Sequence, residues 1–231
     1  MSSVLGINSC TVGKDQVCCF DYLTEEEMDI VNANMVEVHY SKGETICKQG
    51  SFASHIMMIT EGLAKIYLEG AGEMLILKIL PAVNLIGLTS LIEGNTVFQY
   101  SSQAYVPTTV KLIEINTFKD IMKRNGQFAS NVISLLAENT VITYGRFFCL
   151  TKKQTYGRLA DVLLCLAQRV YKEDDFPLLL TRKELAELAS MSVESITRIL
   201  TKFKEDGLIS MKQDRMEILD AERLYKISQS G

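Results

Sequence analysis

Two side chains in the last third of the chain, Glu194 and Arg198, have the chemistry and the spacing needed to read bases in a DNA groove. An arginine guanidinium can donate two parallel hydrogen bonds to guanine, and a glutamate carboxylate can accept one from the amino group of cytosine. Because the residues are four apart, we also expect them to pair and to hold each other's rotamers. Isolated pairs of this kind are more often solvated surface ion pairs, so the surrounding sequence must decide between the two interpretations.

The residues around this pair predict two short helices joined by a tight turn. Thr181 and Glu184 form a capping box at the start of the first helix, and Ser192 can cap the second. The apolar residues of both segments follow helical spacing, at Leu185, Leu188, Ala189, Ile196, Ile199, Leu200 and Phe203. The other face at the start of the second helix carries Val193, Glu194, Thr197 and Arg198. In a helix-turn-helix these positions contact base edges, so we predict a DNA-reading helix.

Short antiparallel strands are predicted over about Met35–Ile115. Alternating or β-branched apolar runs occupy residues 36–40, 55–60, 63–68, 73–80 and 109–115. Turn signals separate these runs, and no helix long enough for a parallel crossover interrupts them. The sequence therefore predicts an antiparallel sandwich or roll, preceded by a short helix that Thr24 and Glu27 cap.

A heptad pattern follows in the helical region that begins at Phe118. It covers about three repeats and comprises Phe128, Val132, Leu135, Asn139, Ile142, Arg146 and Cys149. Polar residues at core positions suit a symmetric dimer, in which each can face its own copy, better than the core of one chain. We therefore predict a dimer seam formed by Val132, Leu135, Asn139 and Ile142. The alternative is a helix packed on its own domain.

Three further elements are predicted nearer the C-terminus. They are a helix over about Thr155–Tyr171, a short strand at Leu178–Leu180, and a hairpin that joins Leu208–Lys212 to Met216–Leu219. A hairpin directly after a helix-turn-helix is typical of a winged DNA-binding domain, which we therefore predict for this part of the chain.

The charge of the chain is unevenly distributed, and its composition excludes several classes of protein. The formal net charge is −4, but residues 1–150 hold 10 Lys and Arg against 15 Asp and Glu, whereas residues 151–231 hold 14 against 13. If the protein binds DNA, its affinity must then come from the positions of individual basic residues and from dimerisation, rather than from a large excess of positive charge. No apolar run approaches the roughly 20 residues of a membrane span, no signal peptide is evident, and six cysteines form no dense disulfide framework. We therefore expect a cytoplasmic protein without a membrane partner.

Several motifs occur together in one known family. They include L-T-R-K-E-L-A-E-L-A-S-M-S-V-E-S-I-T-R-I-L, Y-G-R-L-A-D-V-L-L and K-G-E-T-I-C-K-Q-G. Over nearly its whole length the chain resembles the CRP/FNR group of bacterial transcription regulators, named after the cyclic-AMP receptor and the fumarate-nitrate-reduction regulator. The resemblance implies an α+β protein with an N-terminal arm (1–22), a jelly-roll effector domain of the cyclic-nucleotide-binding type (23–125), a dimerisation helix (126–152) and a winged helix-turn-helix domain (153–231).

The resemblance also implies how such a protein acts. It would be a homodimeric regulator, not an enzyme, that binds an inverted repeat in double-stranded DNA and contacts RNA polymerase. Glu194 and Arg198 match the family's base-reading residues. Three positions match residues that touch phosphate, namely Lys183, Ser192 and Ser195. Val193 and Thr197 resemble the fumarate-nitrate-reduction branch, so we predict a half-site similar to TTGA.

The roll segment that holds the cyclic nucleotide in some family members departs here from their pattern. Those members need a glycine, a glutamate for the ribose and an arginine for the phosphate, because a buried phosphate requires a charged partner. Gly87 is present, but Leu88 replaces the glutamate and Phe98 stands near the arginine position. Thr143 matches a residue that contacts adenine, and Tyr144 follows it. We predict that cyclic AMP is not the effector, and we assign these five residues to an effector pocket.

Other effectors stay open as alternatives. An iron–sulfur cluster would use three N-terminal cysteines, namely Cys10, Cys18 and Cys19. Their spacing departs from the family's, and Ile113 stands at the position of the distant ligand, so Cys47 would have to replace it. Haem would need His39 or His55, and a lone histidine in a strand is more often a surface or core residue. An apolar molecule is a third alternative, and we favour no metal site.

Two functions of other classes compete with this prediction. A metal-dependent enzyme on a jelly roll needs clustered histidine and carboxylate ligands, which two separated histidines do not supply. A cyclic-nucleotide-binding module that does not bind DNA would need the missing glutamate and arginine, and it would not need a helix-turn-helix. Binding to a palindromic TTGA-type duplex distinguishes all three functions.

Overall fold

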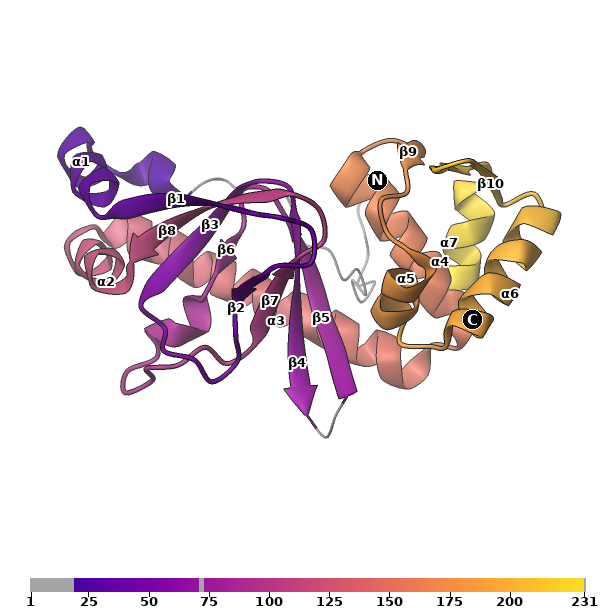
Figure 1. The fold of residues 1–231 in the computed structure, drawn as a ribbon, viewed down its shortest axis with the longest axis horizontal. Coiled ribbons are helices and arrows are strands. Elements are labelled where there is room, and N and C mark those ends of the chain that lie inside the picture. The colour runs from indigo at the N-terminus through magenta and orange to yellow at the C-terminus, as the bar shows by residue number, and fades with distance from the viewer. Residues whose placement is uncertain (1–18, 71–72, 231) are drawn as a thin grey trace. The chain divides into compact units, whose positions relative to one another are not determined.

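The computed structural model describes residues 19–70 and 73–230, and Figure 1 shows their fold. Contacts between residues divide the chain into two compact units. One contains the described chain up to Met74 together with Ile79–Thr140, and the other contains Leu75–Lys78 and the chain from Val141 onward. Among these residues no helix is long and apolar enough to cross a membrane.

The strands form a roll of two sheets, as predicted. Antiparallel pairing joins β1, β8, β3 and β6 in the first sheet and β2, β7 and β4 in the second, which β5 completes. The bounds are β1 (Met35–Tyr40), β2 (Thr45–Cys47), β3 (His55–Glu61), β4 (Leu63–Gly70), β5 (Glu73–Pro81), β6 (Leu85–Ile86), β7 (Ser101–Ala104) and β8 (Thr108–Glu114). The short strands β2, β6 and β7 were not predicted, because runs of two to four residues have no visible periodicity.

One apolar core joins the first sheet to the helices beside it. These helices are α1 (Glu25–Ala33), α2 (Ile115–Arg124) and the first half of α3 (Gly126–Lys152). The predicted capping box at Thr24 begins α1. The rings of Phe20, Phe118 and Phe128 pack with centroids 5.1 to 6.2 Å apart. This aromatic group fixes the 3-10 turn Cys19–Tyr22 against α2 and the first turn of α3.

Most heptad residues of α3 face inward, so the dimer seam prediction is wrong for Val132, Leu135 and Ile142. Val132 and Leu135 belong to the apolar core of the roll, and Ile142 is also buried, with exposed fractions of 0%, 8% and 2%. Asn139 is half-buried, and the buried Arg146 donates through Nε to a backbone carbonyl oxygen of β5 at 3.0 Å. Side chains buried within one chain cannot contact a second copy. A polar residue in a heptad can hydrogen-bond to the backbone of a strand that is distant in sequence. The helical pattern does not reveal such a partner.

The C-terminal part has the predicted winged helix-turn-helix arrangement. Its elements are α4 (Thr155–Cys165), a π-helix (Leu166–Tyr171), β9 (Asp175–Pro177), α5 (Arg182–Ala189), α6 (Val193–Glu205), β10 (Ile209–Lys212), β11 (Arg215–Ile218) and α7 (Ala221–Ser230). The predicted hairpin is β10 and β11, and β9 extends it in the order β10-β11-β9. The strand predicted at Leu178–Leu180 is wrong, because the preceding Asp175–Pro177 pairs with β11. Pro177 is tolerated there because β9 is an edge strand.

Candidate nucleic-acid interface

Caps hold the start of both helices in the helix-turn-helix. The Thr181 hydroxyl accepts a hydrogen bond from the Glu184 backbone N–H at 3.2 Å, and the Glu184 carboxylate accepts one from the Thr181 N–H at 2.6 Å. At α6 the Ser192 hydroxyl accepts from the Ser195 N–H at 3.2 Å. The predicted apolar faces are buried, at Leu185, Leu188, Ala189, Ile196, Ile199, Leu200 and Phe203. The caps and the buried faces together direct the opposite face of α6 to solvent.

Four side chains predicted to read bases are exposed at the N-terminal end of α6. They are Val193, Glu194, Thr197 and Arg198. In the part of the chain that the structure describes, Arg198 has no hydrogen-bond or ion-pair partner. Its guanidinium is therefore available to an acceptor outside the protein.

Glu194 and Arg198 do not pair with each other, so that part of the prediction is wrong. The Glu194 carboxylate instead accepts hydrogen bonds from its own backbone N–H and from the Ser192 hydroxyl, and these bonds lower its pKa below the usual value. Unsatisfied N–H groups at a helix N-terminus attract a carboxylate, and this attraction competes with an arginine one turn away. Glu194 is thereby held in place at the helix terminus, and Arg198 stays free.

The three predicted phosphate contacts lie at the starts of α5 and α6. Lys183 is exposed in the first turn of α5. The Ser192 Oγ lies 3.2 Å from the Ser195 Oγ, and both hydroxyl groups are at the start of α6. A lysine and a hydroxyl at helix N-termini favour an anion, because the helix dipoles add to their effect.

The turn between α5 and α6 contains a strained residue. Ser190 has φ 50° and ψ 58°, the left-handed region that favours glycine. We expect Ser190→Gly to stabilise the domain by up to about 1 kcal/mol, because the strain exceeds the extra entropy of glycine in the unfolded chain. Ser134→Gly, at an exposed position inside α3, is the control and should destabilise by about 1 kcal/mol. Urea unfolding measures both changes, and a loss of stability in Ser190→Gly would contradict the expectation.

The roll segment around Gly87 is packed by the chain's own side chains. Gly87 has a left-handed backbone with φ 97°, and its N–H donates to the Tyr100 hydroxyl at 2.8 Å. Burial raises the pKa of Tyr100, so this hydroxyl stays neutral. Leu88 and Phe98 are buried, and a Cβ on Gly87 would lie only 3.3 Å from the Phe98 ring. Neutral and apolar groups thus surround the backbone N–H where a bound anion would need positive charge.

The other two residues assigned to an effector pocket, Thr143 and Tyr144, are exposed on α3. Tyr144 belongs to a set of exposed large apolar side chains of this helix, which are Ile133, Val141, Tyr144, Phe147 and Phe148. A turn of about 100° per residue gathers these five on one face, opposite the buried heptad residues. We call it the α3 apolar face. Tyr144 is 67% exposed and Phe147 is 70% exposed, which is unusual for aromatic side chains without a partner.

Of the cysteines considered for an iron–sulfur cluster, Cys19 and Cys47 lie in the described part of the chain. Cys19 is buried in the apolar core that also contains Ile113. Cys47 is buried as well, and burial raises the pKa of its thiol to about 12. Cys10 and Cys18 lie outside the described residues. Within residues 19–70 and 73–230, no group of three or more His, Cys, Asp and Glu could hold a metal ion.

The two histidines do not converge on a common site. His39 pairs with Thr109 of β8 and His55 with Glu114, five residues further along, which separates them by about 17 Å along the strand. The Nδ1 atom of His39 lies 3.1 Å from the Thr109 Oγ1, and that of His55 lies 2.7 Å from the Ser54 Oγ. Each histidine therefore has a local hydrogen-bonding role in its sheet.

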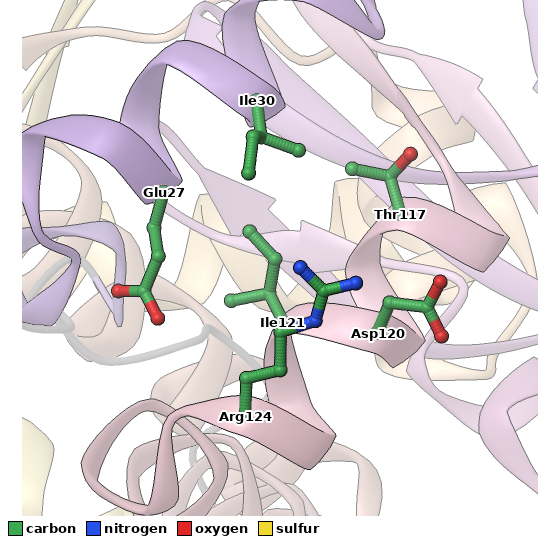
Figure 2. A pocket seen from close by; sticks show the side chains of 6 residues that line it. All are labelled: Glu27, Ile30, Thr117, Asp120, Ile121 and Arg124. Carbon is green, nitrogen blue, oxygen red and sulfur yellow. The ribbon is translucent and has the colours of Figure 1, made fainter.

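A small hollow lies between α1 and α2. It has a volume of about 80 Å³, and its lining residues are Glu27, Ile30, Thr117, Asp120, Ile121 and Arg124 (Figure 2). The Glu27 carboxylate is already engaged, because it accepts from the Asn125 side chain at 2.8 Å and from the Thr24 N–H at 3.0 Å. None of the lining residues is a predicted site residue, and the volume suits a few water molecules.

Both domains match known protein families. Residues 37–125 match the family "Cyclic nucleotide-binding domain", and residues 157–227 match the family "Crp-like helix-turn-helix domain". The first range covers most of the roll, and the second covers α5, α6 and the wing.

Two transcription regulators align with this chain along most of their length. The chain is 25% identical to the transcriptional activator protein anr of Pseudomonas aeruginosa over 212 residues, which cover 89% of this chain and 86% of that protein. It is 24% identical to the fumarate and nitrate reduction regulatory protein of Escherichia coli over 220 residues, covering 92% and 87%. The structure of FixK2 from Bradyrhizobium japonicum shares the fold, with a TM-score of 0.76 at 18% identity over 85% of this chain and 98% of that one.

Proposed function

Since the chain belongs to the CRP/FNR family of DNA-binding transcription regulators, we propose that it acts as a homodimer on an inverted repeat with TTGA-like half-sites. A signal sensed in the roll would control this binding, and the bound dimer would contact RNA polymerase. The observation that carries the proposal is the free Arg198 guanidinium on the exposed face of a capped α6, beside a Glu194 fixed at the helix terminus.

The expected readout follows from the chemistry of these side chains. Arg198 would donate to O6 and N7 of the guanine in TTGA, and Glu194 would accept from the amino group of a cytosine. Lys183, Ser192 and Ser195 would hold phosphates beside the groove and so set the register of the helix. Since the domain has nearly equal numbers of positive and negative residues, two half-sites bound together must supply much of the affinity.

Binding to designed duplexes tests the function. Fluorescence anisotropy with an inverted repeat of TTGA half-sites should give much tighter binding than a scrambled duplex of the same composition at equal salt concentration. Equal affinity for both duplexes would contradict sequence-specific DNA binding to this site. A third duplex with only one half-site should bind weakly, because only one α6 can then reach its bases.

The α3 apolar face supports the homodimer and replaces the seam predicted from sequence. We expect Phe147→Glu to convert the dimer into a monomer, because a symmetric contact would bring two carboxylates together without water. Sedimentation velocity would measure the mass, and affinity for the inverted repeat should fall to that of one half-site. Gln127→Glu is a control with the same new charge on α3, at an exposed position in its first turn and away from Tyr144 and Phe147. A Phe147→Glu protein that stays dimeric would contradict the assignment.

The packing around Gly87 supports an effector other than cyclic AMP. The phosphate of a cyclic nucleotide would have to displace the Tyr100 hydroxyl from the Gly87 N–H, with no arginine to neutralise it. We expect isothermal titration with cyclic AMP to show no binding at micromolar concentrations, and operator affinity to be unchanged by cyclic AMP. Micromolar binding would contradict this expectation.

A further inference from the structure

We propose that Val193 and Thr197 form an apolar strip that reads the 5-methyl group of thymine. This inference rests on the proposed function, because it names the chemical group in DNA that the exposed face of α6 recognises. It would make the two uncharged residues of that face determinants of sequence specificity, next to the charged Glu194 and Arg198.

The Thr197 hydroxyl is committed to the helix itself. Its Oγ1 donates to the Val193 carbonyl oxygen at 3.0 Å. A threonine hydroxyl has a single proton, so this bond leaves none for an acceptor on a base edge. The side chain is exposed all the same. Thr197 therefore presents no donor to the groove, only an acceptor oxygen and its methyl group, and the methyl group is the part that an apolar group on a base can contact.

Val193 extends the same apolar surface by one turn. It precedes Thr197 by four residues, so the two side chains are neighbours along the helix surface. Val193 is 40% exposed at the first position of α6. In the major groove thymine is the base that presents a methyl group, and valine or threonine methyl groups are suited to contact it. Since Glu194 and Arg198 each follow a strip residue directly, the thymine should adjoin the base pair that Arg198 reads.

Replacing thymine by uracil tests the inference, because uracil lacks only the methyl group. The duplex should be the inverted repeat that wild-type protein selects from a randomised pool, so the test does not depend on the TTGA prediction. We expect uracil at the contacted position to weaken wild-type binding about fourfold per half-site, or about fifteenfold when both half-sites are changed. Thymines elsewhere in the repeat should tolerate the change.

Protein variants should remove this sensitivity. Thr197→Ser keeps a hydroxyl and loses the methyl group, so it should bind the thymine and uracil duplexes nearly alike, as should Val193→Ala at its own position. Thr201→Ser is the matched control, because Thr201 makes the same hydrogen bond, to the Thr197 carbonyl oxygen at 3.0 Å, nearer the C-terminal end of α6. It should keep the full uracil effect.

The outcomes distinguish failure of the methyl-reading strip from failure of the proposed function. If the pool enriches a repeat but no uracil substitution changes affinity, or if Thr197→Ser keeps the wild-type uracil effect, the methyl-reading strip is refuted while sequence-specific binding stands. The base pair that Arg198 reads is the one at which Arg198→Ala loses its preference. If the enriched repeat has no thymine next to that base pair, the strip is refuted as well. If no sequence is enriched, the proposed function fails and this inference fails with it.

Discussion

Replacing Arg198 with alanine is expected to abolish specific binding to the operator. Arg198 is exposed, has no partner in the described chain, and lies one turn into a helix whose start is fixed by the Ser192 cap. A bidentate contact to guanine contributes about 1–3 kcal/mol per half-site. Because a homodimer makes the contact twice, affinity for the inverted repeat should fall by at least about thirtyfold. Fluorescence anisotropy at fixed salt measures the loss.

Two controls show whether the loss concerns base reading or charge. Arg198→Lys keeps the positive charge but lacks the planar fork, so it should bind a scrambled duplex like wild type and still lose preference for the operator. Lys204→Ala removes a positive charge from the exposed last turn of the same helix, and it should lower affinity for both duplexes slightly and equally. Unchanged operator affinity in Arg198→Ala would contradict the mechanism.

Removing Asp161 is expected to destabilise the C-terminal domain by about 3–5 kcal/mol. The Lys153 Nζ lies 2.5 Å from the Asp161 Oδ2, with side chains only 6% and 11% exposed, and the Cys149 thiol donates to the same oxygen at 3.6 Å. Lys153 lies directly after α3 and Asp161 lies in α4, so the pair joins the end of one helix to the next. In Asp161→Ala the buried lysine charge would lose this carboxylate. For a domain of this size, that loss corresponds to a fall in melting temperature of at least about 12 °C.

A double variant distinguishes the buried charge from the loss of packing. In Lys153→Met/Asp161→Leu both charges are gone and similar volumes remain, so stability should return to near the wild-type value or above it. Thermal unfolding of both variants compares the two effects. A double variant as unstable as Asp161→Ala would show that the ion pair is not the cause, and a stable Asp161→Ala would refute the prediction.

Local sequence was sufficient to predict α6 and its caps. The Thr181–Glu184 box and the Ser192 cap involve residues three apart, and the buried face of α6 follows from spacing within one helix. The same reasoning located the longer strands of the roll. It failed for the two- to four-residue strands β2, β6 and β7, and it placed a strand at Leu178–Leu180 instead of Asp175–Pro177, because pairing with β11 decides that register.

The long helix shows where periodicity stops being informative. Its heptad residues and its exposed aromatic residues both follow helical spacing, so a sequence pattern alone cannot say which face the roll covers. Val132 and Leu135 belong to the same apolar core as Phe20 and Phe118, of which Phe20 is far away in sequence, and only the folded chain reveals this. The face that stays exposed is therefore the one with Tyr144 and Phe147.

The sequence by itself determined the family and the winged helix-turn-helix, and it predicted the residues that read DNA. These features depend on short spacings and on residue types that the side-chain chemistry requires. The folded structure decided where several side chains direct their hydrogen bonds, both within α6 and within the roll. Glu194 turns to the helix terminus instead of to Arg198, the Thr197 hydroxyl turns to Val193, and the Tyr100 hydroxyl reaches the Gly87 N–H. Each donor or acceptor has several candidate partners within reach, and only the folded geometry selects among them.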